Sequence, residues 1–242
     1  MGHDPVSLDA VTVHPLSGAD EEVLLGAIEA RLPTASVLTL LLARCVASTE
    51  GPLGPVADRL AIGEREVLAL RLRAAMLPGP MVATMSCASC GEAIEMSFDP
   101  AAIASSIDAP VRSATIEVDG YRLTCRAVTG ADQHDAVQTS EDTEACGRAL
   151  LARCVSATDA TGASVAAEAL PREVAERAAE CVLALDPGAE TTLSATCPGC
   201  GTPVSGLLDA GSFVLTELAR RAAALPAEVL AIARATGWDE AS

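Results

Sequence analysis

The sequence predicts an α+β fold made of two tandem-duplicated, mainly helical lobes. Each lobe is expected to end in a short β-hairpin zinc knuckle of the zinc-ribbon type, and a C-terminal helical segment follows. Three observations lead to this prediction. Short motifs recur in the same order about 110 residues apart, and a C-x-x-C-Gly motif closes each copy. Half of the 242 residues are apolar but only 2% are aromatic, so leucine, valine and alanine must fill the core.

The duplication is inferred from six ordered matches between the two halves of the chain. The offset between matching residues runs from 107 to 112. A single match would be chance, whereas six in the same order indicate descent from one repeat. The matches are Ser17–Asp20 with Thr129–Asp132, Leu41–Val46 with Leu150–Val155, Arg65–Val67 with Arg172–Val174, Pro78-Gly79 with Pro187-Gly188, Cys87–Gly91 with Cys197–Gly201, and Asp99 with Asp209.

The repeat places the first lobe over residues 1–110, the second over 111–211 and the C-terminal helices over 212–242. Ser17 and Thr129 each precede an Asp by three residues, a capping-box spacing that starts a helix. The expected strands at the lobe starts are Val11–Val13 and Arg122–Arg126. Further helices are expected at about Ser36–Ala47, Glu64–Met76, Thr143–Ser156 and Arg172–Leu185. The strands around the knuckles are expected at Met81–Met85, Ala93–Phe98, Thr191–Ala195 and Pro203–Leu208.

Two further segments connect and follow the lobes. The segment Ile116–Leu123 predicts a hairpin that turns at Asp119-Gly120. After the second lobe, Ser212 is expected to cap a helix. Pro226 is expected to kink that helix or to start another one, which Gly237 ends.

The net charge of −17 argues against a partner rich in phosphate groups. Sixteen basic residues face thirty-three acidic ones, and affinity for nucleic acid comes from clustered basic side chains. No N-terminal segment has the pattern of a signal peptide. The apolar run Val37–Leu42 is far shorter than the roughly 20 residues that span a bilayer. We therefore expect a cytoplasmic protein without a nucleic-acid partner or a membrane-inserted segment.

Four of the nine cysteines form two C-x-x-C pairs, Cys87 with Cys90 and Cys197 with Cys200. A knuckle of strand, C-x-x-C-Gly and strand presents two thiolates from one tight turn. Two such knuckles supply the Cys₄ set that tetrahedral Zn²⁺ prefers. The pairs are farther apart in the chain than zinc-ribbon pairs usually are, but equivalent knuckles of two related lobes can meet across a pseudo-two-fold axis. We expect these four cysteines to hold one structural zinc ion that clamps the lobes.

Other interpretations of the two pairs stay open. A thioredoxin-like dithiol usually lies at a helix N-terminus, whereas strand-like segments follow both pairs. The segment Met85–Cys90 is similar to the loop of copper-trafficking domains, although no long helix follows it. Four thiolates also suit an iron–sulfur cluster, and the thiols could be free and buried. The other cysteines are expected to be structural core residues; they are Cys45, Cys125, Cys146, Cys154 and Cys181.

The sequence gives little indication of catalysis. His3, His14 and His134 are the only histidines, and none has the spacing of a metal ligand or of a general base. Phosphate-binding loops, dinucleotide fingerprints and nucleophile elbows are missing. A zinc ion with four cysteine ligands has no open position for a substrate. We therefore expect a protein that is not an enzyme and has no small-molecule substrate.

The repeated helices and knuckles resemble the baseplate protein family of T-even-type phages and of phage-derived contractile injection systems. The similarity runs from about residue 11 to the end of the chain, and it rests on Thr84–Asp99, Ala195–Asp209 and the closing segment Phe213–Trp238. One departure is Ala88, where the family commonly has proline.

The resemblance implies a non-enzymatic structural or assembly component of a contractile-tail baseplate, with other baseplate or tail proteins as partners. It places the protein in the cytoplasm of the producing cell and, once assembled, in a phage-tail-like particle. The alternative function is a thiol redox or metal-handling protein that uses the two C-x-x-C pairs.

Overall fold

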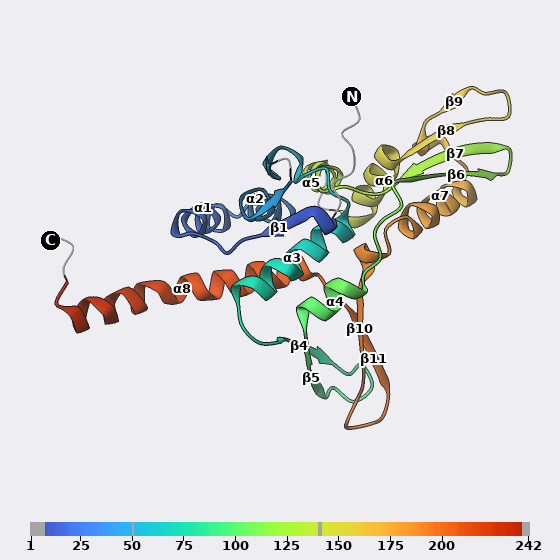
Figure 1. Cartoon of the computed structure of the whole chain (residues 1–242). Coiled ribbons are helices and arrows are strands. Elements are labelled where there is room, and N and C mark those ends of the chain that lie inside the picture. The colour runs from blue at the N-terminus through green and yellow to red at the C-terminus, as the bar shows by residue number, and fades with distance from the viewer. Residues whose placement is uncertain (1–7, 50, 140–141, 239–242) are drawn as a thin grey trace.

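The computed structural model describes residues 8–49, 51–139 and 142–238. The architecture is a mixed α/β arrangement of helices and small antiparallel sheets (Figure 1). The elements of the first half are η1 (Leu8–Ala10), β1 (Val11–Val13), α1 (Gly18–Glu29), α2 (Thr34–Cys45), β2 (Val46–Ser48), β3 (Gly51–Pro52), η2 (Gly54–Val56), α3 (Ile62–Met76), β4 (Met81–Ser86), β5 (Ala93–Phe98) and α4 (Pro100–Ser106).

The second half follows nearly the same order of elements. They are β6 (Ser113–Val118), β7 (Tyr121–Arg126), α5 (Gly130–Thr139), α6 (Thr143–Cys154), β8 (Val155–Thr158), β9 (Ser164–Val165), η3 (Ala167–Ala169), α7 (Arg172–Ala184), η4 (Pro187–Glu190), β10 (Thr192–Thr196), β11 (Pro203–Leu207) and α8 (Ala210–Thr236). One three-stranded sheet has the order β1-β2-β3, a four-stranded sheet has the order β6-β7-β8-β9, and β4-β5 and β10-β11 are separate hairpins.

The same arrangement of polar groups starts α1 and α5. Ser17 caps α1 through a capping box with Asp20, whose carboxylate also accepts a hydrogen bond of 2.5 Å from Arg44. The hydrogen bond from Ser17 is the main reason why the pKa of Asp20 falls to about 2. The sequence match that ends α2 and α6 therefore supplies an arginine that faces this capping box.

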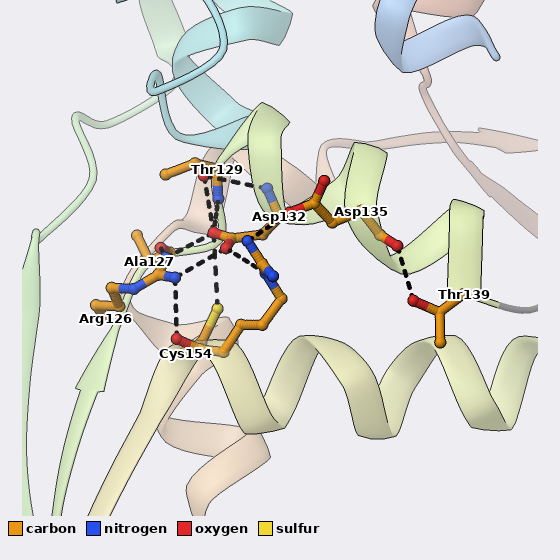
Figure 2. A network of polar contacts seen from close by, with 8 residues as sticks. Arg126, Ala127, Thr129, Asp132, Asp135, Thr139 and Cys154 are labelled. Atoms are coloured by element: carbon orange, nitrogen blue, oxygen red, sulfur yellow. Dashed lines mark hydrogen bonds and ion pairs between the residues drawn. The ribbon is translucent and has the colours of Figure 1, made fainter.

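In the second half, Thr129 and Asp132 form the equivalent box, and Arg153 contacts the same carboxylate at 3.1 Å (Figure 2). Arg126 adds a bidentate pair at 2.6 and 2.8 Å. Burial alone would raise the pKa of Asp132, but these arginines and Thr129 hold that pKa well below its usual range. The thiol of Cys154 donates a hydrogen bond to the same carboxylate. Burial raises the pKa of this thiol to about 11.

The hydrophobic core has two main parts, and the larger one mixes both ends of the chain. Leu41 and Leu68 of the first half are fully buried there. Leu193, Val214 and Leu218, from β10 and the start of α8, belong to the same cluster. The smaller core lies between β7, β8 and α7. Residues 193–218 thus cover residues 24–72 of the first half, while the predicted boundaries at residues 110 and 211 stay predictions.

Helix α3 lies at the centre of this arrangement and buries several charged side chains. Arg65 donates hydrogen bonds to Thr39 and to the carbonyls of Ala35 and Ala57. Arg73 forms a bidentate pair with Glu217 of α8 at 2.9 and 3.2 Å.

Glu66, also on α3, accepts hydrogen bonds from the backbone of Ala210 and Gly211, at 2.5 and 3.2 Å. These two N–H groups belong to the first turn of α8, which has no intrahelical partner for them. Glu66 and Arg73 together therefore anchor the first half of α8 on α3.

The two halves meet closely at the N-terminus of α3. The backbone N–H of Ile62 donates to the carbonyl of Val128 at 3.1 Å, and that of Gly63 donates to the Asp186 carboxylate at 2.8 Å. A Cβ atom on Gly63 would lie 2.8 Å from the Cα atom of Gly188. Only hydrogen atoms at both glycines permit this approach of the two backbones.

Several predicted elements are confirmed, and others differ. The hairpin of β6 and β7 turns at Asp119 and Gly120, whose φ angles are 49° and 82°. Asp209, not Ser212, caps α8. The helix continues through Pro226, so no separate helix starts there; a proline removes only one N–H donor from the helix. The short strands β2, β3, β8 and β9 and the helix α4 were not predicted.

Candidate metal centre

Each C-x-x-C pair lies in the turn of a β-hairpin. Cys87 follows β4, and its backbone N–H donates to the carbonyl of Glu92 at 2.8 Å. Gly91 donates back to the Cys87 carbonyl at 2.8 Å and has a φ of 77°. A positive φ of this size suits glycine, which explains the residue after the second cysteine.

The second hairpin forms the same turn with equivalent backbone hydrogen bonds. The backbone N–H of Cys197 donates to the carbonyl of Thr202, and that of Gly201 donates to the carbonyl of Cys197, both at 2.9 Å. Gly201 has a φ of 74°. Figure 1 shows the hairpins β4-β5 and β10-β11 together at one end of the molecule. Two segments far apart in the sequence thus present the same pair of thiols to each other.

The four sulfur atoms form one cluster. The Sγ atoms of Cys87 and Cys200 lie 3.6 Å apart, and so do those of Cys90 and Cys197. All four lie within 4.8 Å of one another, so they could hold a metal ion. A tetrahedral ion with bonds of about 2.3 Å to sulfur requires sulfur separations of about 3.8 Å. A disulfide would require about 2.05 Å.

The site has a buried side and an exposed side. Cys87 and Cys197 are buried, whereas Cys90 and Cys200 reach the surface. The buried thiols pack with Ile94 in a small apolar cluster, against which Met96, Ala195 and Val204 also pack. A Cβ atom on Gly206 would lie 2.8 Å from the Sδ atom of Met85. This close packing of the two hairpins keeps the four sulfur atoms at ligand distance.

The exposed thiols differ in acidity because they share hydrogen bonds. Hydrogen bonds with Thr202, and after them those with the thiols of Cys90 and Cys87, together lower the pKa of Cys200 to about 6. The pKa of Cys90 is raised to about 12, because Cys197 and Cys200 outweigh the backbone N–H of Glu92. The thiol of Cys200 is therefore a stronger acid than that of Cys90.

The other predicted residues lie apart from this cluster. Cys45, Cys125 and Cys154 are buried, and Cys146 and Cys181 are half-buried. Burial is also the main reason why the pKa of Cys125 rises to about 12. Within the part of the chain that the structure describes, the four-cysteine group is the one set of side chains able to hold a metal.

The histidines do not contribute to the cluster. His134 contacts the hydroxyl of Ser36 at 2.8 Å, and His14 contacts the carbonyl of Pro15 at 3.4 Å. His3 lies outside the described residues. The chemistry of this site is therefore that of four thiols, a donor set that suits zinc or an iron–sulfur cluster. With all four bound to one ion, no position stays open for a substrate.

Comparison with protein-family models, with curated proteins and with solved structures returned no match. Among the helices that the structure describes, none is both long enough and apolar enough to cross a membrane. The four sulfur atoms remain the feature from which a function can be inferred.

Proposed function

We propose that Cys87, Cys90, Cys197 and Cys200 hold one structural Zn²⁺ ion, and that this ion joins two lobes descended from one repeat. The observation that carries the proposal is the meeting of two identical turns in one cluster of sulfur atoms. A separation of 3.6 Å suits thiolates that share a single ion. In a four-iron cluster each thiolate binds a different iron atom, which would spread the sulfur atoms farther apart.

The duplication is supported by more than the cysteines. The capping boxes at Ser17 and Thr129 are equivalent, and each accepts an arginine from the end of the next long helix. Asp99 and Asp209 each cap the helix that follows a knuckle. These side chains carry out the same local function at matching positions, which is expected of copies of one ancestral lobe.

We further propose that the protein is a non-enzymatic structural or assembly component of a contractile-tail baseplate. Its resemblance to the baseplate family supports this function, as does a site whose four thiolates leave no room for a substrate. In this role the ion fixes the relative position of the lobes, and the helical surfaces bind other baseplate or tail proteins. The protein would be made in the cytoplasm of the producing cell and joined to a phage-tail-like particle.

Metal analysis tests the site. The purified protein should contain one zinc ion per chain, and Cys87→Ser and Cys197→Ser should each lose it completely. Cys146→Ser is the matched control, because that half-buried thiol lies outside the cluster and donates to the Ala136 carbonyl at 3.4 Å. Two ions per chain, or zinc retained in either single variant, would contradict the shared site.

Deletion of the gene in the producing strain tests the baseplate function. Electron microscopy should then show sheath and tube components without complete baseplates, and a copy with intact cysteines should restore them. Normal particles after deletion would exclude the baseplate function while leaving the zinc site untouched.

A thiol redox or metal-handling protein is the second candidate, since one cysteine of each pair is exposed. Rapid alkylation of Cys90 and Cys200 in the metal-loaded protein favours that candidate. Slow alkylation with retained zinc favours the structural site.

A further inference from the structure

Two close contacts between thiols cross from one hairpin of the metal centre to the other. One contact joins Cys87 of β4-β5 to Cys200 of β10-β11, with 3.6 Å between the Sγ atoms. The other contact joins Cys90 to Cys197 over the same distance. A Cβ atom on Gly199, in the turn of the second hairpin, would lie 3.7 Å from the Sγ atom of Cys90. The thiols of one hairpin therefore lie against the turn of the other.

Each of these contacts joins an exposed thiol to a buried one. Cys90 and Cys200 are exposed, whereas their partners Cys197 and Cys87 are buried. An oxidant in solution reaches the exposed sulfur atom first. An exposed thiolate that a peroxide oxidises to a sulfenic acid condenses with a neighbouring thiol to form a disulfide. The buried partner of each exposed cysteine is in place for this second reaction.

The packing of the two hairpins does not depend on the thiols alone. Ile94 packs with the buried thiols, and Met96 and Val204 pack against this cluster from the two hairpins. The side chain of Met85 fills the space beside Gly206 of the other hairpin. These contacts stay in place when a metal ion leaves. The sulfur atoms of each pair then need to approach from 3.6 Å to about 2.05 Å to form a bond.

We propose that oxidation by a peroxide converts the cluster into two disulfides that join the hairpins, Cys87–Cys200 and Cys90–Cys197, and releases the zinc ion. In the first step an exposed thiolate attacks the peroxide, becomes a sulfenic acid and, with one proton, releases one water molecule. The buried thiolate beside it then attacks the sulfenic sulfur, forms the Sγ–Sγ bond and, with a second proton, releases another water molecule. In total, four thiolates, two hydrogen peroxide molecules and four protons give two disulfides, four water molecules and one free zinc ion.

A disulfide within one C-x-x-C pair is the competing product. A cross-link restricts the unfolded chain more strongly when it closes a longer loop. The two bonds across the hairpins join residues that are 113 and 107 positions apart, whereas a bond within one pair joins residues three positions apart. The bonds across the hairpins therefore stabilise the folded protein more, and they keep the two halves of the chain joined after the ion is lost.

This inference rests on the proposed zinc site and extends its role beyond the reducing cytoplasm. A phage-tail-like particle that leaves the producing cell enters an oxidising medium, in which disulfides persist. There the covalent bonds would take over the connection that the zinc ion makes inside the cell.

Peptide mapping of the oxidised, zinc-loaded full chain tests the proposal. Hydrogen peroxide should release one zinc ion for every two peroxide molecules consumed, as measured with a chromogenic chelator. The protein is then alkylated in denaturant and cleaved after glutamate without a reductant. This cleavage places the first C-x-x-C pair in residues 67–92 and the second in residues 191–217. The two peptides should appear joined, with a mass four hydrogen atoms below their sum, and a reductant should separate them.

Separate peptides that have each lost two hydrogen atoms would overturn the proposal, and so would sulfinic or sulfonic acids in place of disulfides. Zinc that stays bound to unreacted thiols would overturn it as well. Purified protein without zinc would contradict the proposed function, whereas separate oxidised peptides from a zinc-loaded protein would contradict only this inference.

Two double variants identify the reacting pairs. Cys90→Ser/Cys197→Ser retains Cys87 and Cys200 and should form the disulfide between the hairpins. The matched variant Cys90→Ser/Cys200→Ser retains two buried thiols, and it should lose most of the reaction with peroxide because no exposed thiol starts it. Equal reaction of both variants would refute the order of the steps. Tandem mass spectrometry of the joined wild-type peptides identifies the same pairs if either variant does not fold.

Discussion

The carboxylate of Glu66 should make the stability of this protein depend on pH. Burial raises its pKa from 4.5 to about 7, and the nearby Asp209 acts in the same direction. The backbone groups of Ala210 and Gly211 and the guanidinium of Arg65 oppose this rise only in part. A pKa that is higher in the folded state means that ionised Glu66 destabilises the fold.

The pH window and the size of the effect follow from these pKa values. The stabilisation that the protonated Glu66 carboxyl gives the fold is fully present below pH 4.5, where Glu66 is protonated in both the folded and the unfolded protein. This stabilisation is lost as the pH rises through about 7. Each unit of pKa difference corresponds to 1.36 kcal/mol, so the upper limit is about 3 kcal/mol. Glu66→Gln keeps a carbonyl oxygen as acceptor for both N–H groups without the charge. We expect it to be up to about 3 kcal/mol more stable than the wild type at pH 8, and equal to it near pH 4.5.

Urea denaturation of both proteins at several pH values between 4.5 and 8.5 measures this difference. The four-cysteine cluster is common to both proteins, so its own pH dependence cancels in the comparison. Glu66→Ala is the control, because it removes the acceptor and should be destabilised at every pH. The reasoning would be refuted if Glu66→Gln were less stable than the wild type at pH 8, or if its gain did not change with pH.

Three further predictions concern the junction, the capping network and the metal. Gly63→Ala should destabilise the protein by about 2 kcal/mol in urea titrations, because the new Cβ meets the backbone of Gly188, whereas Gly147→Ala, with open space around it, should be neutral or stabilising. Asp132→Ala should lower the free energy of unfolding by about 2 kcal/mol in the same assay, since two arginines and the cap of α5 lose their shared acceptor. A loss smaller than that of an ordinary surface substitution would contradict this role of Asp132. A chelator should lower the melting temperature of the wild type, and it should leave that of Cys87→Ser unchanged.

Local patterns predicted much of the fold. The turns at Cys87 and Cys197 and the cap at Ser17 depend on neighbouring residues, so a short stretch of sequence contains the information they need. The convergence of the two knuckles was predicted from the repeat, which relates segments that are distant in the chain. The structure brings those four cysteines together.

Long-range packing could not be predicted in the same way. The packing of α8 on α3 depends on Glu66 and Arg73, and both resemble ordinary surface charges of an amphipathic helix in the sequence. Arg65 is only 1% exposed, and its partners are mostly backbone carbonyls, which leave no trace in a sequence. Two-residue strands such as β3 are too short to show an alternating pattern.

The larger core closes only when residues 193–218 join residues 24–72. During synthesis residues 24–72 therefore leave the ribosome before the apolar side chains that pack on them, which follow more than a hundred residues later in the chain. Such an interval exposes a nascent chain to aggregation and to chaperones. Fragments that end before α8 should consequently be insoluble or quickly degraded, even when they contain every residue from 24 to 72.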